Sequence, residues 1–374
     1  MIVTIANAHQ QTLIFIIILS IVFLFLLKKN SSEGLFSIKH TQEIKGFAIL
    51  SIIFAHVGYY LVNDTQFLFP VSILAGVGIE LFLFLSAFGL TTSALNKSMT
   101  ILQFYKRRLL KLFIPLWLIL GIFIALDYFV LHITYSTEYI LTAFAGIFTH
   151  ANLYEDINSP FWYFTFILFY YLVFPLFFSK KYTWASALCI FVITYIIVKW
   201  NPTYLAHTLP LYKIHLVSFP LGMITAWALT KKRLLSLFSL KVKNRIFLKI
   251  VRFVAISFLL LFIGYTALHS GVGKSPLVEQ LVSLSTMVAI LILFLIKKVH
   301  STLFSLFGIY SYELYLFHWP ILYRYDILFR YLPAWLALLI DLIVFLCLAW
   351  VLQKVVMRIQ KIFENPHTTQ KKTK

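Results

Sequence analysis

His56 stands in an apolar stretch that begins at Ile44, and Lys45 lies at the start of that stretch. A titratable imidazole in hydrocarbon costs free energy, so a function is expected where one occurs. In a helix, eleven positions at about 100° each bring Lys45 and His56 to nearly the same face, roughly 16 Å apart along the axis. This pattern suits a cation that holds a phosphorylated donor at the membrane surface and a base that acts deeper in. The alternative is a core histidine that donates to a backbone carbonyl.

Glu80 is a second ionisable residue within an apolar run. Counting inward from Val71 places it about 14 Å deep in the same half of the bilayer as His56. A carboxylate there could hold an imidazole in one tautomer and stabilise the imidazolium after proton abstraction. We therefore expect His56 and Glu80 to be catalytic. The alternative for Glu80 is a neutral packing carboxyl that hydrogen-bonds to a serine or tyrosine.

A dense basic cluster precedes another apolar run and consists of Arg107, Arg108 and Lys111. These residues fall within about one helical turn of each other, which favours binding of phosphate groups. Together with Lys45 they form the predicted donor site. The alternative is an anchor that touches lipid headgroups.

The run from Gly308 to Pro320 is unusually polar for a membrane span. Ser311, Tyr315 and His318 recur there at helical spacing and form a face able to hydrogen-bond a sugar or a carbonyl. Trp162 lies in an aromatic stretch at a predicted outer surface, and we add it to this predicted substrate-binding group. The alternatives are a tyrosine-rich packing seam for the polar run and an interfacial aromatic belt for Trp162.

Several residue types carry no prediction of chemistry. Asp127, His132 and His150 are expected to be solvated groups near outer helix ends, and Asp341 is assigned no role. Cys189 and Cys347 lie within spans and read as core residues. No metal-ligand cluster, phosphate-binding glycine loop, dinucleotide turn or nucleophilic serine elbow occurs in the sequence, so no metal is predicted.

The composition identifies the elements that must position these residues. Hydrophobic residues make up 61% of the 374 residues and charged residues 12%, a balance typical of membrane proteins. We predict an all-α, polytopic helix bundle with about eleven spans. The runs are Thr12–Leu27, Ile44–Val62, Val71–Ala94, Leu109–Leu131, Phe161–Phe178, Thr183–Val198, Leu211–Leu229, Phe247–Leu268, Leu277–Ile296, Thr302–Leu322 and Ala334–Val356. A shorter run, Leu141–Phe148, is expected to be interfacial or re-entrant.

Lys and Arg crowd alternate loops, which predicts the N-terminus outside and the C-terminus in the cytoplasm. The net charge of +19 then reflects topology and attraction to anionic membrane lipid, and we expect no nucleic-acid partner. Three regions are predicted: an additional N-terminal anchor and cytoplasmic linker (1–36), a membrane domain (37–357) and a basic, disordered cytoplasmic tail (358–374). The sequence does not indicate an oligomeric state.

At these residues the chain resembles the acyltransferase-3 family of integral membrane acyltransferases, from about Ile38 to Leu352. Lys45 and His56 match the family's Arg or Lys, ten residues, then His. Glu80–Phe88 is similar to acidic-Leu-Phe-Phe-x-Leu-Ser-Gly-Phe, and Tyr105–Pro115 to Arg-Arg-x-x-Arg-x-x-Pro. Tyr310–Pro320 is similar to Tyr-Ser-x-x-Leu-Tyr-Leu-x-His-x-Pro. Each motif is weak alone, but four in order are specific.

Four features depart from the family pattern. Lys45 replaces the commoner arginine and so lacks its bidentate fork, and Ala87 stands where glycine is usual. Ile167 and Leu168 occupy the stretch where many members carry paired glutamates. The span before Ile44 is additional to the common ten-helix core.

The resemblance implies transfer of an acyl group, usually acetyl from cytosolic acetyl-coenzyme A, to a hydroxyl of an envelope glycan such as lipopolysaccharide O-antigen or exopolysaccharide. It also implies a multi-pass protein of the bacterial cytoplasmic (inner) membrane. His56 would deprotonate the acceptor hydroxyl or briefly carry the acyl group. Two alternatives stay open at this point: a carrier of a glycan or lipid-linked sugar, and another membrane acyltransferase class that acts on lipid or protein.

Overall fold

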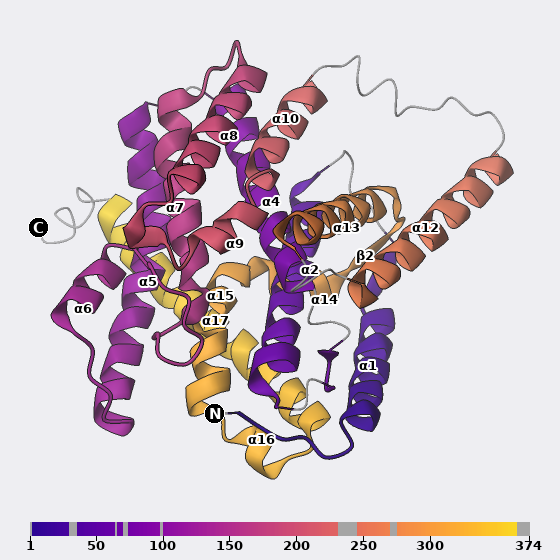
Figure 1. Ribbon diagram of the computed structural model, residues 1–374. Coiled ribbons are helices and arrows are strands. Elements are labelled where there is room, and N and C mark those ends of the chain that lie inside the picture. Colours follow the sequence, from indigo (N-terminus) through magenta and orange to yellow (C-terminus); the bar gives the residue numbers. More distant parts are fainter. Residues whose placement is uncertain are drawn as a thin grey trace, which may run out of the picture. The chain divides into compact units, whose positions relative to one another are not determined.

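The computed structural model describes residues 2–29, 36–63, 66–69, 74–97, 100–230, 245–269 and 275–364 (Figure 1). The chain divides into two compact units, each assembled from separate parts of the sequence. The His56 unit comprises Ile2–Ser98 and Leu176–Ile309, and the His318 unit comprises Met99–Pro175 and Tyr310–Lys374. The predicted disordered tail (358–374) is wrong at its start, because residues 358–364 belong to the helix Ala334–Glu364, and its remaining residues lie outside the described residues, as do residues 231–244.

The His56 unit is built from helices and one small antiparallel sheet. In the sheet, β1 (Leu27–Lys29) pairs with β2 (Val299–Ser301). A π-helical segment, η1 (His56–Leu61), directly follows α2. The helices are α1 (Ala8–Phe25), α2 (Ile38–Ala55), α4 (Leu74–Asn96), α8 (Thr183–Trp200), α9 (Leu209–Ile214), α10 (Ser218–Thr230), α12 (Arg245–Leu268), α13 (Pro276–Ile296) and α14 (Thr302–Ile309).

Burial separates the central helices of this unit from its peripheral ones. The apolar span that contains α2 is 78% buried and that of α4 is 72% buried, whereas among the described side chains of α12 only Leu259 and Thr266 are buried. The core includes Ile44, Val77, Leu81, Phe84 and Met287. Side chains of α12 and of much of α1 are therefore available to lipid, while the two helices that carry His56 and Glu80 are enclosed by protein.

Two glycines allow α2 and α14 to cross at very short distance. A Cβ added at Gly46 would lie 1.7 Å from the backbone oxygen of Phe304, and one at Gly308 would lie 1.8 Å from that of Gln42. Only glycine fits such a contact, because any side chain would occupy the space of the facing backbone. The crossing fixes the start of α2, and with it the segment that bears Lys45.

The His318 unit contains the second group of predicted site residues. Thr100 and Gln103 form a reciprocal capping box that sets the start of α5, about two turns before the basic cluster. The elements are α5 (Ile101–Val130), α6 (Thr137–Phe144), η2 (Ser159–Phe161), α7 (Trp162–Phe177, which runs just past the boundary of the unit), α15 (Ser311–Pro320), the π-helical η4 (Ile321–Tyr325), α16 (Leu328–Tyr331) and α17 (Ala334–Glu364).

The predicted all-α membrane fold is confirmed. Among the described residues, nine helices are long and apolar enough to cross a membrane, and they coincide with nine of the eleven predicted runs. The other two runs are interrupted: Leu211–Leu229 becomes α9 and α10, and Thr302–Leu322 becomes α14 and α15. Leu141–Phe148 overlaps the short helix α6. The interruptions matter because polar residues of the predicted site lie beside them.

Gly46→Ala is expected to lower the free energy of unfolding by about 1–3 kcal/mol or more, because the new methyl group must push two backbones apart. Gly89→Ala in α4 is the matched control, since a Cβ there meets nothing within 4 Å and alanine favours helix. The melting temperatures of both purified variants in nanodiscs test this. Equal melting temperatures would contradict the close crossing.

Candidate active site

The Glu80 carboxylate lies in the core of the His56 unit and contacts two polar side chains of a distant segment. His215 Nδ1 is 3.0 Å from Glu80 Oε1, and the Ser218 hydroxyl donates to Glu80 Oε2. Glu80, His215 and Ser218 are 1%, 4% and 0% exposed. A Cβ at Gly76 would lie 3.9 Å from His215 Cε1, so the imidazole packs against the first turn of α4. Sequence reasoning missed His215 and Ser218.

The interruption between α9 and α10 places His215 and Ser218 beside this carboxylate. Pro220 lies in the first turn of α10, where the missing N–H is not needed by the helix. A helix continuing through His215 would need that N–H and would collide with the proline ring. The freed backbone groups are tolerated because the segment is enclosed by protein. Pro220 was the signal in the sequence that could have predicted the interruption.

His56 lies at the junction of α2 with the π-helical η1 and is 9% exposed. Its ring centroid lies 5.8 Å from that of Tyr60. A π-helical turn alters the direction of the following side chains and often marks a functional site. The predicted helix that joins Lys45 to His56 is confirmed: α2 is continuous from Lys45 to Ala55, and His56 is its C-cap. Whether Glu80 orients His56 stays a prediction.

Lys45 is half-buried near the start of α2, close to a polar cluster that the sequence did not indicate. The carboxylate of Glu43, which is fully buried, accepts hydrogen bonds from Lys297 Nζ and the Ser301 backbone N–H. His300 Nδ1 lies 3.2 Å from its other oxygen. Burial lowers the pKa of Lys297, and the bond to Glu43 opposes that shift. The cluster ties the segment around Lys45 to β2.

In the His318 unit, α15 carries Ser311, Tyr315 and His318, and all three are buried. His318 Nδ1 lies 2.9 Å from the Leu314 carbonyl oxygen and 3.1 Å from that of Tyr315. Carbonyl oxygens only accept, so Nδ1 carries the proton of the neutral ring and Nε2 is the basic nitrogen. The π-helical η4 begins just after Pro320, so this histidine, like His56, lies close to a π-helical turn.

The aromatic stretch around Trp162 packs against α15. The Tyr315 hydroxyl donates to the Pro160 carbonyl at 2.9 Å, and the rings of Phe161 and Tyr163 lie 6.0 and 5.6 Å from that of Tyr315. Trp162 itself is half-buried. The predicted substrate-binding residues Trp162 and Tyr315 therefore lie on neighbouring elements of one unit.

The basic cluster near the start of α5 is accessible. Arg107 and Lys111 are exposed, and Arg108 is half-buried with its guanidinium 6.0 Å from the centre of the Tyr171 ring. The cluster belongs to the His318 unit, whereas Lys45, His56 and Glu80 belong to the His56 unit. The predicted site residues are thus shared between the two units.

The expectation that Asp127 is a solvated cap is wrong. Asp127 is fully buried, and its carboxylate accepts hydrogen bonds from Arg324, Tyr135 and Tyr325. Its position at the end of an apolar helix suggested a surface group, because the sequence does not show that its partners come from other segments. Among the described residues, no group of three or more His, Cys, Asp and Glu side chains is arranged to hold a metal ion.

Ser218→Ala is expected to lower the free energy of unfolding by about 1–3 kcal/mol, because it removes a donor from a buried carboxylate. Ser285→Ala on α13 is the control: its hydroxyl bonds only its own helix and it is exposed, so a change within about 0.5 kcal/mol is expected. Thermal unfolding in nanodiscs measures both. An equal loss in the two variants would contradict a stabilising role for the contact with Glu80.

Comparison with known proteins gives one match. The family model described as an acyltransferase domain, Acyl_transf_3, matches residues 44–354, which include every predicted catalytic, donor-binding and substrate-binding residue. No curated protein and no solved structure matches the chain. The four motifs and the all-α membrane architecture agree with the family match. The chain therefore belongs to the acyltransferase-3 family of membrane acyltransferases.

Proposed function

We propose that the protein is an O-acetyltransferase that moves acetyl from cytosolic acetyl-coenzyme A to a hydroxyl of an envelope glycan, such as lipopolysaccharide O-antigen or exopolysaccharide. The observation that carries the proposal is the family match across residues 44–354. In this proposal the protein spans the bacterial cytoplasmic membrane with its N-terminus outside and its C-terminus inside. No metal takes part, and membrane lipid surrounds the helices.

The donor would be held by its phosphates. The proposal assigns the phosphates to Lys45, Arg107, Arg108 and Lys111, and the exposure of Arg107 and Lys111 supports access from water. Arginine binds phosphate through a planar pair of N–H donors, whereas lysine acts as a point charge. Lys45 would therefore supply charge without fixing the orientation of the phosphate, and Arg108 is better suited to orient it.

The acetyl transfer breaks the thioester C–S bond and forms an ester C–O bond, and the hydroxyl proton ends on the coenzyme A thiolate. His56 would take that proton as general base, or would carry the acetyl group on a ring nitrogen before the acceptor attacks. Glu80 would stabilise the imidazolium formed in either route. The contact of Glu80 with His215 supports only the coarser point that this carboxylate can pair with an imidazole in the enclosed core.

The exposed side chains of α12 and of much of α1 favour a second acceptor class, on lipid or protein. An acceptor on lipid or protein could approach from the bilayer and use the same histidine. Labelled acetyl-coenzyme A supplied to membranes distinguishes the two: label on glycan supports the proposal, and label on lipid or protein supports the other class. A carrier would leave no acetyl label on any acceptor.

His56→Ala and His56→Gln are expected to lower kcat by about 10²–10⁴-fold, the usual contribution of a positioned acid–base group. Donor binding should persist, because the imidazole does not contact the phosphates in this proposal. The assay is transfer of labelled acetyl to envelope glycan, with His269→Gln as control because His269 is exposed in the same unit. Wild-type activity of both His56 variants at normal protein levels would contradict the assignment of His56 as catalytic.

Arg108→Ala is expected to raise the KM for acetyl-coenzyme A by an amount equivalent to about 1.5–3 kcal/mol, the value of a charged hydrogen bond. The KM for the acceptor should hardly change, and high salt should reproduce part of the effect. Lys106→Ala is the matched control, an exposed cation on the same helix. Unchanged donor affinity in Arg108→Ala would make the cluster a topology anchor.

A further inference from the structure

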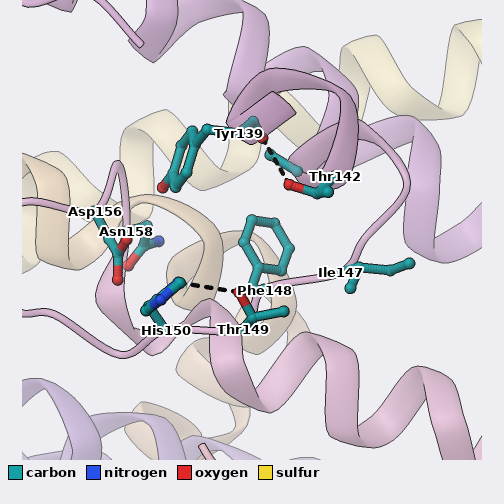
Figure 2. Close-up of a pocket in the computed structure, with 9 residues that line it drawn as sticks. Tyr139, Thr142, Ile147, Phe148, Thr149, His150, Asp156 and Asn158 are labelled. Atoms are coloured by element: carbon teal, nitrogen blue, oxygen red, sulfur yellow. Dashed lines mark hydrogen bonds between the residues drawn. The ribbon is translucent and has the colours of Figure 1, made fainter. Parts of the chain in front are cut away.

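A cavity of about 230 Å³ lies within the His56 unit, between the additional helix α1 and the helices α2 and α14. It is partly open to its surroundings. Its walls come from Leu19, Ser20 and Phe23 of α1, four residues of α2, Leu74 and two residues of α14. The hollow in Figure 2 is much smaller, because it offers only about 20 Å³, which is room for about one water molecule. The cavity beside α1 therefore has the space that a larger ligand needs.

Helix α1 spans this cavity and contacts the rest of the unit at either end of it. The ring of Phe15 lies 5.4 Å from that of Phe54. The ring of Phe23 lies 5.0 Å from that of Phe304. Phe15 and Phe23 are eight positions apart, which is about 12 Å along a helix. Ser20 lies between these two contacts, and its small side chain leaves the space between the helices open.

The cavity lies on the side of α2 opposite to the predicted catalytic face. The residues that α2 contributes follow one another at helical spacing: Phe47, Leu50, Ser51 and Phe54. At about 100° per residue, their mean direction differs by roughly 180° from that of Lys45 and His56. A ligand in the cavity would therefore lie behind the helix that carries His56, and it would not be the acyl group that the enzyme transfers.

The walls of the cavity suit a hydrocarbon chain. Eight of the ten lining residues are leucine or phenylalanine, and the Ser51 hydroxyl donates to the Phe47 carbonyl at 2.9 Å. Water is disfavoured in such a space, since an apolar cavity of about 150 Å³ in another protein stays dry and holds benzene. Both α1 and α2 are long and apolar enough to cross a membrane, so the surrounding solvent at this depth is lipid hydrocarbon. A lipid chain therefore has both the chemistry and the access.

A basic strand lies at one end of the cavity. β1 begins one residue after α1 and carries Lys28 and Lys29, which are both exposed. Its partner β2 leads directly into α14, two residues of which line the cavity. The Thr302 N–H donates to the Leu26 carbonyl at 3.1 Å and joins the two segments where the helices meet the sheet. The positive charge of the two lysines is complementary to the headgroup of an anionic lipid.

We propose that the cavity holds one acyl chain of an anionic phospholipid, whose headgroup phosphate is bound by Lys28 and Lys29. The chain would fill the space between α1 and α2 and so fasten the additional helix to the core of the unit. In the predicted orientation the two lysines lie at the cytoplasmic surface, where anionic lipids concentrate. The inference is independent of the proposed reaction, because no predicted catalytic, donor-binding or substrate-binding residue takes part in it.

Photolabelling of the full-length protein in nanodiscs tests this site. The two probes are phosphatidylglycerol and phosphatidylcholine that carry the same diazirine in one acyl chain, each added at the same fraction to a phosphatidylcholine bilayer. Mass spectrometry then locates the label on the protein. We expect phosphatidylglycerol to label Leu50, Ser51 and Phe54, the three lining residues of α2 that are buried. Lipid that only surrounds the protein would label exposed side chains instead.

Two variants of α1 test whether the chain occupies the cavity. Ser20→Trp should reduce the labelling of the three buried residues about tenfold or more, because the indole overpacks the space that the chain needs. Ile21→Trp is the matched control, since Ile21 is exposed on the same helix and does not line the cavity. Its labelling pattern should equal that of the wild-type protein.

Two pairs of lysines test the headgroup. Replacing Lys28 and Lys29 by glutamine should reduce labelling by phosphatidylglycerol about fivefold for each lysine removed, while labelling by phosphatidylcholine should not change. Replacing Lys180 and Lys181 by glutamine is the matched control, because these two neighbouring lysines are exposed in the same unit. Labelling by either lipid should persist in the control.

Each contrary outcome overturns a stated part of the proposal. Absence of label from the three buried residues, or an equal loss in Ser20→Trp and Ile21→Trp, would overturn the cavity as a site for a lipid chain. Equal labelling by the two lipids, or an equal loss from both lysine pairs, would overturn the anionic headgroup. Melting temperatures are measured in the same nanodiscs, and Ser51→Leu fills the cavity from α2 in case Ser20→Trp fails to fold.

Discussion

The structure depends on finding partners for carboxylates that are shut away from water. Glu43, Glu80 and Asp127 are each at most 1% exposed, and a charge in such surroundings is tolerated only when it is paired and hydrogen-bonded. Each obtains a partner from far along the chain: Lys297 lies 254 positions after Glu43, Ser218 lies 138 after Glu80, and Arg324 lies 197 after Asp127. These contacts join distant segments within each unit and hold the helices that carry the candidate site.

Departures from regular helix supply the second requirement of such a site. A continuous α-helix satisfies its own backbone and presents side chains at one fixed spacing. The interruption before Pro220 and the π-helical turns at His56 and after Pro320 break that spacing in enclosed surroundings. In hydrocarbon such irregular backbone is viable only inside protein. The irregular segments that could position catalytic side chains are therefore the same segments that must be enclosed by protein.

The sequence predicts local features well because they depend on nearby residues. Periodicity and hydropathy predict the helical stretch from Lys45 to His56, the burial of Glu80 and the nine continuous apolar helices found in the described part of the chain. Long-range pairing was not predictable in the same way. Asp127 has the sequence context of a surface cap, and only the return of Arg324 from a remote segment makes it a buried group. His215 was missed because the average hydropathy of Leu211–Leu229 conceals the interruption in this run, although Pro220 indicated that interruption.

The short sheet has a consequence for how the protein is made. β1 follows the additional helix α1, and its partner β2 is encoded near the end of the His56 unit. During synthesis β1 cannot pair with β2 until almost the whole unit has emerged from the ribosome. Until then the N–H and C=O groups of β1 form an open strand edge. Of the two strands in this sheet, the one translated first is therefore paired only when the second has been made. Biogenesis of the N-terminal extension is thus coupled to the arrival of the segment that also neutralises Glu43.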